Sequence, residues 1–177
     1  MDASELYDPE FRKLIKSKNP TIIIPVGSLE QHGAHLPITT DSDIVTEVAS
    51  RLAKKCGFIV LPTISYGISF EHSPLFNTSI PKTTLRTILF NIMKSLLDNG
   101  VKNFFILNGH HGNRRVGELR YKQFMRCPIY SYWYFMKHEF DHAGFVETSL
   151  MLAISDKVKM EKAEKGLITK GLSEKEI

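Results

Sequence analysis

The sequence predicts an α/β domain of three layers, with a mostly parallel central sheet and helices on both of its faces. Short apolar runs alternate along the chain with longer segments of helical periodicity, and this alternation is typical of βαβ units with right-handed crossovers. Histidines and carboxylates gather directly after the apolar runs. Ligands of such sheets bind outside the carboxyl ends of the strands, so the pattern also predicts where a functional site lies.

Four apolar runs are predicted to form the strands: residues 21–26, 58–64, 103–108 and 128–135. The first of them, TIIIPV, has the β-branched composition of a strand that is buried on both faces. We therefore expect it to lie inside the sheet rather than at an edge.

The segments between the runs are predicted to form helices. Apolar residues recur with helical spacing over 43–55 and again over 85–97, where Asn99-Gly100 provides a stop signal. We also expect a polar helix from about Asn113 to Met125 and a further helix that begins near Glu147.

Size and composition are those of a globular protein. The chain has 177 residues, 42% of them hydrophobic and 24% charged, so we expect one domain over 1–177. No apolar run approaches the roughly 18 residues that a membrane span requires, and the start of the chain does not resemble a leader sequence. These features predict a cytoplasmic protein with no membrane partner.

The charge distribution argues against nucleic acid as a partner. Lys and Arg number 23 against 19 Asp and Glu, a net charge of +4, but residues 156–177 mix both signs as a charged C-terminal helix or tail does. No basic stripe with interleaved aromatic residues is present. Cys56 and Cys127 match no metal-binding spacing, so we interpret both as reduced, buried thiols.

All seven histidines follow one of the four predicted strands: His32 and His35, His72, His110 and His111, and His138 and His142. In the first segment, PVGSLEQHGAHLPITTD, Glu30 and His32 are two residues apart and would project to the same side of an extended backbone. Asp41 stands where it could cap the following helix, but beside Glu30 and His32 we favour a metal ligand. Carboxylates and imidazoles without thiolates suit Zn²⁺, Mn²⁺ or Fe²⁺.

Two later segments add candidate residues. LNGHHGN places His110 after a strand, although the adjacent His111 leaves open which imidazole is used. DHAGFVETS pairs His142 with Glu147, and its alternative interpretation is a helix start in which Glu147 favours the helix dipole.

These three segments, in this order, resemble the signature segments of the creatininase family, a group of metal-dependent amidohydrolases. The resemblance covers about residues 22–152 and includes the loop YGISFEHSPLFNTSI. It implies a creatininase-like αβα fold with a site for up to two divalent ions, in which Asp41 bridges the ions. Glu30 and His110 would bind one ion, and His32 and Glu147 would bind the other.

The resemblance also implies roles beyond metal binding. His142 resembles the catalytic histidine of the family, and Trp133 stands near the position of an aromatic residue that covers the substrate. Creatininase itself takes one acidic ligand from two residues after the histidine of the LNGHHGN segment, where this chain has Gly112. That difference assigns the role to Glu147 and predicts that creatinine is a poor substrate.

We therefore predict a hydrolase of non-peptide C–N bonds in small amides. A formamidopyrimidine-nucleotide deformylase-like activity is one specific case, in which Arg114 would hold the phosphate of the substrate. The alternative is a shortened, catalytically idle homologue that binds metal for structure or assembly. Family members form rings of dimers, so the resemblance further implies a homo-oligomer, with a hexamer as one form.

Overall fold

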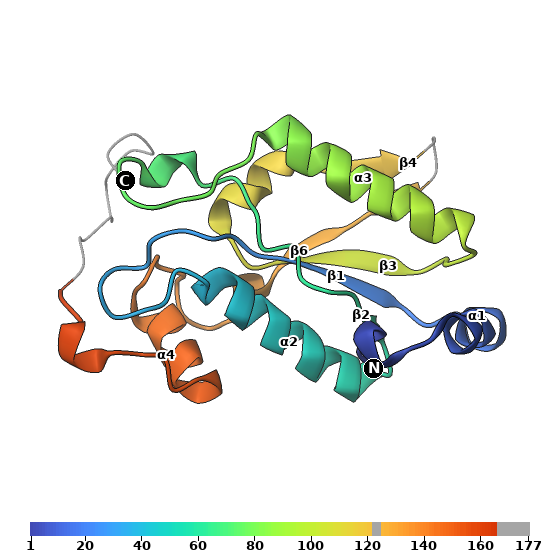
Figure 1. Ribbon diagram of the computed structural model, residues 1–177, viewed down its shortest axis with the longest axis horizontal. Helices are drawn as coiled ribbons and strands as arrows, with labels where there is room; N and C mark the ends of the chain where they lie inside the picture. The colour runs from blue at the N-terminus through green and yellow to red at the C-terminus, as the bar shows by residue number, and fades with distance from the viewer. Residues whose placement is uncertain (122–124, 166–177) are drawn as a thin grey trace.

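The computed structural model describes residues 1–121 and 125–165, and a parallel sheet lies at its centre (Figure 1). The strands, in the spatial order β2-β1-β3-β6, are β2 (Ile59–Val60), β1 (Ile22–Val26), β3 (Phe104–Asn108) and β6 (Ile129–Ser131). Every pairing in this sheet is parallel. The predicted α/β class is confirmed.

Helices cover both faces of the sheet, as Figure 1 shows. They are α2 (Thr40–Cys56) and α4 (Phe145–Ile154) on one face and α3 (Lys82–Asp98) on the other. The side chains of β1 alternate between the two cores. Ile22 and Ile24 belong to the apolar cluster beneath α3, whereas Ile23 belongs to the cluster beneath α2. All three are fully buried, which explains the unbroken apolar run.

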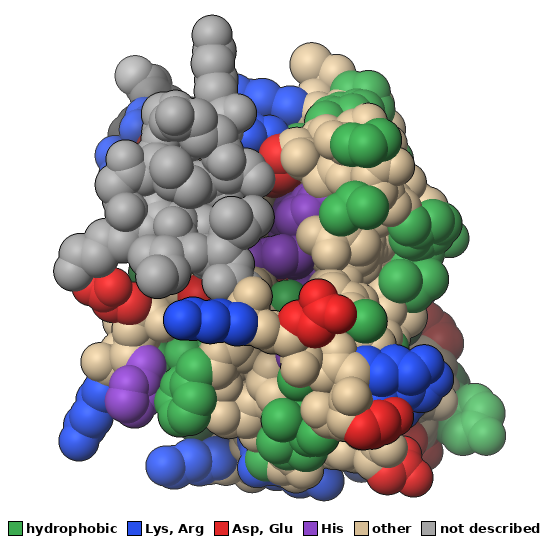
Figure 2. All heavy atoms as spheres, turned by 90° about the vertical axis from the view of Figure 1, so that its left-hand side faces the viewer, with side chains coloured by type: hydrophobic (Ala, Val, Ile, Leu, Met, Phe, Trp, Pro, Cys, Tyr) green, Lys and Arg blue, Asp and Glu red, His purple; other side chains and the backbone are tan. Residues whose placement is uncertain are grey.

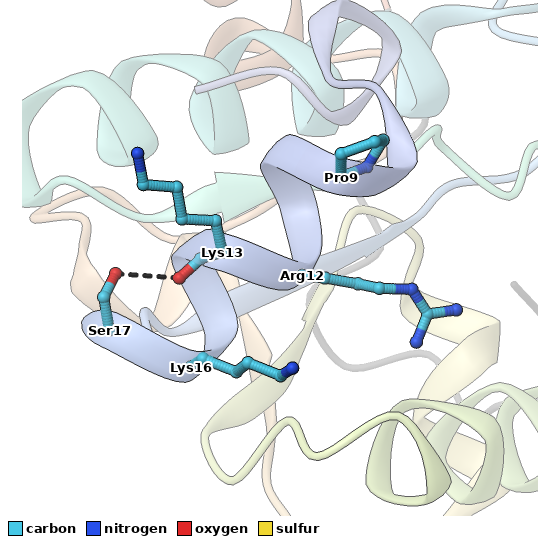
Figure 3. Close-up of a pocket in the computed structure, with 5 residues that line it drawn as sticks. All are labelled: Pro9, Arg12, Lys13, Lys16 and Ser17. Carbon is cyan, nitrogen blue, oxygen red and sulfur yellow. Dashed lines mark hydrogen bonds between the residues drawn. The ribbon is translucent and has the colours of Figure 1, made fainter.

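Helix α1 (Asp8–Ser17) was not predicted from the sequence. It begins with Pro9 in its first turn, and the side chain of Glu10 accepts a hydrogen bond from the backbone nitrogen of Tyr7 at 3.2 Å. A shallow pocket on this helix is lined by Pro9, Arg12, Lys13, Lys16 and Ser17 (Figure 3). Its lining offers neither a carboxylate nor an imidazole.

The predicted polar helix over 113–125 is wrong. The segment forms a 3-10 helix η3 (His111–Val116) and the antiparallel strands β4 (Leu119–Tyr121) and β5 (Met125–Cys127), with residues 122–124 outside the description. The helix ends because Gly117 adopts a left-handed φ of 67°. Leu119 and Cys127 then face each other and are fully buried in the core, which a solvated helix would not allow.

Two predicted strands are shorter than their apolar runs. Only Ile59 and Val60 of 58–64 form β2, because Pro62 has no N–H to donate, although the backbone nitrogen of Ile64 still reaches the carbonyl of Pro25 at 3.0 Å. In 128–135, the strand β6 passes into a 3-10 helix η4 (Tyr132–Phe135).

The remaining elements are short 3-10 helices: η1 (Ala3–Glu5), η2 (Phe70–His72) and η5 (Met160–Lys162). Of the predicted C-terminal tail, residues 166–177 lie outside the described part. Cys127 is buried as predicted, whereas Cys56 is exposed at the end of α2. No helix within the described ranges is long and apolar enough to cross a membrane.

Candidate metal centre

Five predicted ligands lie together at the carboxyl ends of the parallel strands. Their exposed fractions are 0% for Glu30, 0% for His32, 1% for Asp41, 3% for His110 and 0% for Glu147. Figure 2 shows histidine side chains at the bottom of a hollow on this face of the molecule. Buried carboxylates and imidazoles are costly unless they have partners, so their concentration here indicates a functional site.

Local backbone structure brings the β1 loop and the start of α2 to this place. Glu30 lies in the loop after β1 and forms a backbone bridge with Asn77. Asp41 is the second residue of α2, and the turn after β3 passes directly beneath it. A Cβ atom at Gly109 would come within 2.7 Å of the Asp41 carbonyl oxygen, so only glycine permits this approach.

The first group of ligand atoms contains Glu30, Asp41 and His110. His110 Nδ1 lies 3.1 Å from Glu30 Oε1 and 3.0 Å from Asp41 Oδ2. Its other nitrogen, Nε2, donates to the carbonyl oxygen of Ile68 at 2.8 Å. That hydrogen bond fixes the ring so that Nδ1 faces the carboxylates.

The second group lies on the other side of Asp41. His32 Nε2 is 3.3 Å from Asp41 Oδ1 and 3.7 Å from Glu147 Oε2. The Nδ1 atom of His32 donates to the backbone oxygen of Glu30 at 3.1 Å, which orients the ring. Asp41 thus presents one oxygen to each histidine, Oδ1 to His32 and Oδ2 to His110, and its helix has no side-chain cap.

Two further histidines complete the wall of the site. His142 joins His32 and Glu147 in one group of converging ligand atoms, and it joins Glu30 and His72 in another. The Nε2 atom of His72 lies 3.0 Å from Glu30 Oε1. His72 therefore contacts the carboxylate of Glu30, although it is not one of the five predicted ligands.

The donor set fits a divalent cation. Three buried carboxylate oxygens have no hydrogen-bond partner: Glu30 Oε1, Asp41 Oδ2 and Glu147 Oε1. One imidazole nitrogen, His110 Nδ1, lies 3.0–3.1 Å from two of these oxygens without the alignment of a hydrogen bond. Lone pairs that converge in this way, and that would otherwise be left unsatisfied, are typical of ligands for a shared ion.

Protons on histidines balance the buried carboxylates when no ion is bound. Burial opposes the charged form of His32, but the hydrogen bond and charge of Asp41 outweigh it and raise the pKa of His32 to about 9. Burial also opposes the charged form of His110, whose pKa Asp41 and Glu30 raise well above its ordinary value. Burial raises the pKa of Glu147 to about 8. A cation that binds here would displace these protons.

We expect the chelator-treated protein to lose stability as the pH rises from 6.5 to 9. The folded protein holds a proton on His32 up to about pH 9, whereas the unfolded chain releases it near pH 6.5. The raised pKa of Glu147 acts in the same direction up to about pH 8. The loss from His32 alone is about 3 kcal/mol. Urea unfolding after chelation measures it, and an unfolding free energy that is constant over this range would contradict the assignment.

Residues 4–175 match the profile of the creatininase family, whose description is creatinine amidohydrolase. The chain belongs to the creatininase family. The resemblance that three sequence segments indicated is confirmed over most of the chain.

Curated relatives of this creatininase-family chain are hydrolases by name. It is 30% identical over 183 residues to the creatinine amidohydrolase of Pseudomonas putida, which covers 85% of this chain and 70% of the relative. It is 34% identical over 151 residues to the mycofactocin precursor peptide peptidase of Mycobacterium ulcerans, covering 78% of this chain and 60% of the relative. A third relative is the 2-amino-5-formylamino-6-ribosylaminopyrimidin-4(3H)-one 5'-monophosphate deformylase of Methanosphaera stadtmanae, 37% identical over 106 residues, covering 54% of this chain and 42% of the relative.

Solved creatininase structures share the fold. A manganese form matches with a TM-score of 0.83 and 26% identity, covering 94% of this chain and 77% of that chain. A zinc–zinc form of a creatininase variant matches with a TM-score of 0.82 and 27% identity, covering 93% of this chain and 77% of that chain. These forms support a divalent metal as the cofactor of the family site.

The two adjacent histidines, His110 and His111, have different surroundings. His110 faces the carboxylates, whereas His111 Nε2 accepts a hydrogen bond from Arg114 Nη1 at 2.8 Å. The guanidinium of Arg114 also lies over the Tyr134 ring, 5.8 Å from its centroid. Trp133 is buried, with its ring stacked on Phe140 at 4.5 Å and a more distant contact with His111 at 6.3 Å.

The structure leaves no room at Gly112 for the acidic side chain that the resemblance to creatininase implies at this position. A Cβ atom built there would collide with the carbonyl oxygen of Ile68. It would also lie 2.6 Å from His110 Nε2 and 2.7 Å from Glu71 Oε1. With this backbone, residue 112 supplies no carboxylate, and Glu147 joins Asp41 as an acidic residue beside His32.

Two residues of the site were not singled out from the sequence. Gln31 contacts both His72 and His142. Glu71 lies 3.8 Å from His110 Nε2 and forms an ion pair with Arg115 at 3.0 Å. Gln31 stands between two residues that were identified as ligands, so its position was the available signal, whereas the contacts of Glu71 depend on how distant loops meet.

Proposed function

We propose that this protein is a metal-dependent amidohydrolase that cleaves a non-peptide C–N bond, an amide or formamide, of a small molecule. One observation carries the proposal: buried carboxylate and imidazole ligand atoms converge around Asp41, whose two oxygens face His110 on one side and His32 on the other. The complete donor set also argues against a catalytically idle homologue. Structural metal sites are typically closed by thiolates, which this cluster lacks.

In this proposal, Glu30, Asp41 and His110 hold one divalent ion. His32, Asp41 and Glu147 hold a second, with zinc as the first choice and manganese or iron as alternatives. Ions bound there supply Lewis acidity for an amide carbonyl and for water. The protein contributes the fixed orientation of the ligands, because hydrogen bonds to backbone oxygens hold both histidine rings.

His142 is the proposed proton carrier. Its side chain is 33% exposed, so a substrate can reach it from the hollow. Burial and the charge of His32 lower the pKa of His142 to about 4, which keeps the imidazole neutral and able to accept a proton. Its Nδ1 atom lies 3.9 Å from Glu30 Oε1, on the side of the carboxylates. In this proposal His142 accepts a proton from the attacking water and passes it to the leaving nitrogen of the substrate, which departs as an amine.

An anionic substituent on the substrate is the proposed partner of Arg114. Within the described residues, the contacts of Arg114 are with a histidine and an aromatic ring rather than with a carboxylate. A guanidinium without a counter-ion suits a phosphate or carboxylate. Trp133 is proposed to form the aromatic wall beside His111. A formylamino-pyrimidine nucleotide meets both requirements.

Turnover of a panel of amides by the metal-loaded protein tests this function. We expect formamides, and anionic ones most of all, to be hydrolysed faster than creatinine, because the backbone at Gly112 leaves no room for the acidic ligand of creatininase. A ligand supplied from another position alters which carbonyls reach attack geometry. Arg114→Ala should raise KM for the anionic formamides alone. Creatinine as the best substrate would contradict the argument from Gly112, and no turnover of any amide would contradict the function.

We also propose that the protein forms a homo-oligomer, with a hexamer as one form. Support comes from aromatic side chains exposed at and beside the edge strand β6, namely Tyr130 at 43%, Tyr134 at 55% and Phe135 at 75%. Adjacent exposed aromatics on one edge are typical of an interface. Light scattering that gives a particle of only 20.2 kDa at micromolar concentration would exclude it.

A further inference from the structure

Gln31 links two histidines that line the proposed centre. Its side-chain nitrogen Nε2 lies 3.0 Å from His72 Nδ1 and 3.1 Å from His142 Nε2. Its side-chain oxygen Oε1 accepts a hydrogen bond from the backbone nitrogen of Gly33 at 3.0 Å. The backbone nitrogen of Gln31 donates to the carbonyl of Phe76 at 2.8 Å, so the residue is fixed at both ends.

These contacts determine which way the Gln31 amide points. The N–H of Gly33 requires an acceptor, so the oxygen end faces Gly33 and the NH₂ end faces the histidines. His72 Nδ1 must then be the acceptor of that NH₂ group. The proton of a neutral His72 is left on Nε2, 3.0 Å from Glu30 Oε1. His72 therefore turns an N–H toward the Glu30 carboxylate, without the alignment of a hydrogen bond, and offers no lone pair to a metal on that side.

Gln31 holds His142 as well. His142 Nε2 lies 3.0 Å from the backbone oxygen of Gln31 and 3.1 Å from its amide nitrogen. A protonated Nε2 can donate to the backbone oxygen of Gln31, and an unprotonated Nε2 can accept from the side-chain NH₂ group of Gln31. In either protonation state, Gln31 is the hydrogen-bond partner of His142 Nε2. The ring of His142 is further confined between His32 and His72, at centroid distances of 4.4 and 4.5 Å.

We propose that Gln31 is a positioning residue for the reaction, which directs the Nε2–H of His72 to Glu30 and the Nδ1 of His142 toward the carboxylates. The inference rests on the proposed function, because His142 is the proton carrier there. Gln31 touches no reacting atom. It acts through the two imidazoles.

Two substitutions test the role of Gln31. Gln31→Met keeps the length of the side chain and removes both the donor and the acceptor. Gln31→Glu keeps the acceptor for Gly33 and replaces the donor to His72 with an oxygen, which should place a proton on His72 Nδ1. Asn99→Ala is the matched control, because the exposed Asn99 amide at the end of α3 donates to the carbonyl oxygen of Ser95 at 2.9 Å and contacts no residue of the cluster.

For both Gln31 variants we expect kcat to fall roughly 10- to 100-fold, the loss typical of residues that orient ligands. The KM and the metal content should stay at the values of the parent and of the Asn99→Ala control. ¹⁵N NMR of histidine in the zinc-loaded protein provides a readout independent of activity. The parent should show His72 protonated at Nε2, and Gln31→Glu should show it protonated at Nδ1.

Parent-like kcat in Gln31→Met, or a His72 tautomer that does not change in Gln31→Glu, would overturn the proposal. A fall in kcat that tracks a loss of metal would overturn it as well, since that result assigns Gln31 to metal retention. Should the parent itself turn over no amide, the proposed function fails. The NMR comparison still decides whether Gln31 sets the tautomer of His72.

Discussion

Asp41→Ala is expected to empty both metal positions. The two oxygens of Asp41 face different histidines, Oδ2 toward His110 at 3.0 Å and Oδ1 toward His32 at 3.3 Å. Removing this carboxylate takes a ligand from each ion and leaves two buried imidazoles without their main counter-charge. Elemental analysis after reconstitution with zinc and dialysis should find almost no metal in the variant. His32→Ala, which alters one group only, should lose one ion and keep the other.

Asp43→Ala is the matched control for this experiment. Asp43 stands two residues further along α2, where its carboxylate accepts hydrogen bonds from Thr39 and Lys157 and takes no part in the cluster. It should retain the metal content of the parent. Equal metal content in the Asp41→Ala variant and the parent would remove Asp41 from its bridging role.

His142→Ala is expected to retain metal and lose turnover. The imidazole of His142 lies at the edge of the cluster, 3.9 Å from the nearest Glu30 oxygen, so its removal leaves Glu30, Asp41 and His110 in place. A positioned proton carrier typically contributes 10²- to 10⁴-fold, and we expect kcat to fall by about that factor. The measurement is the hydrolysis of a formamide by the zinc-loaded variant, with its metal content determined on the same sample.

A second histidine in the same loop provides the control. His138 contacts the Phe145 ring, 5.5 Å away, and lies outside every group of converging ligand atoms within the described residues. His138→Ala should turn over substrate at the rate of the parent. A His142→Ala variant with full kcat would remove His142 from the mechanism, and one that loses its metal would make it a ligand.

The sequence predicted those parts of the fold whose structure depends on the residues of a single segment rather than on contacts between distant segments. The unbroken β-branched run around Ile23 required burial on both faces, and β1 lies inside the sheet with helices on each side. Glu30 and His32 project together because they are two residues apart. Asp41 followed from the same segment. The candidate ligands that lie in this one segment could therefore be predicted without knowledge of the tertiary structure.

Features that depend on distant contacts were missed. The 113–125 segment has the composition of a polar helix, but the left-handed turn at Gly117 lets Leu119 and Cys127 pair within the core. The role of Gln31 depends on His72, which is 41 positions away. Helix α1 is a different case. Its start signal, Pro9 in the first turn followed by Glu10, is local, so this helix was predictable without tertiary contacts.

Zinc anomalous scattering from crystals of the reconstituted protein tests the central claim most directly, because it locates the ions without reference to activity. The account predicts two peaks about 3.5–4 Å apart. One should contact Glu30 and His110, the other should contact His32 and Glu147, and Asp41 should contact both. A map with no peak in this cluster, or with a single ion that Asp41 does not touch, would contradict the two-metal centre.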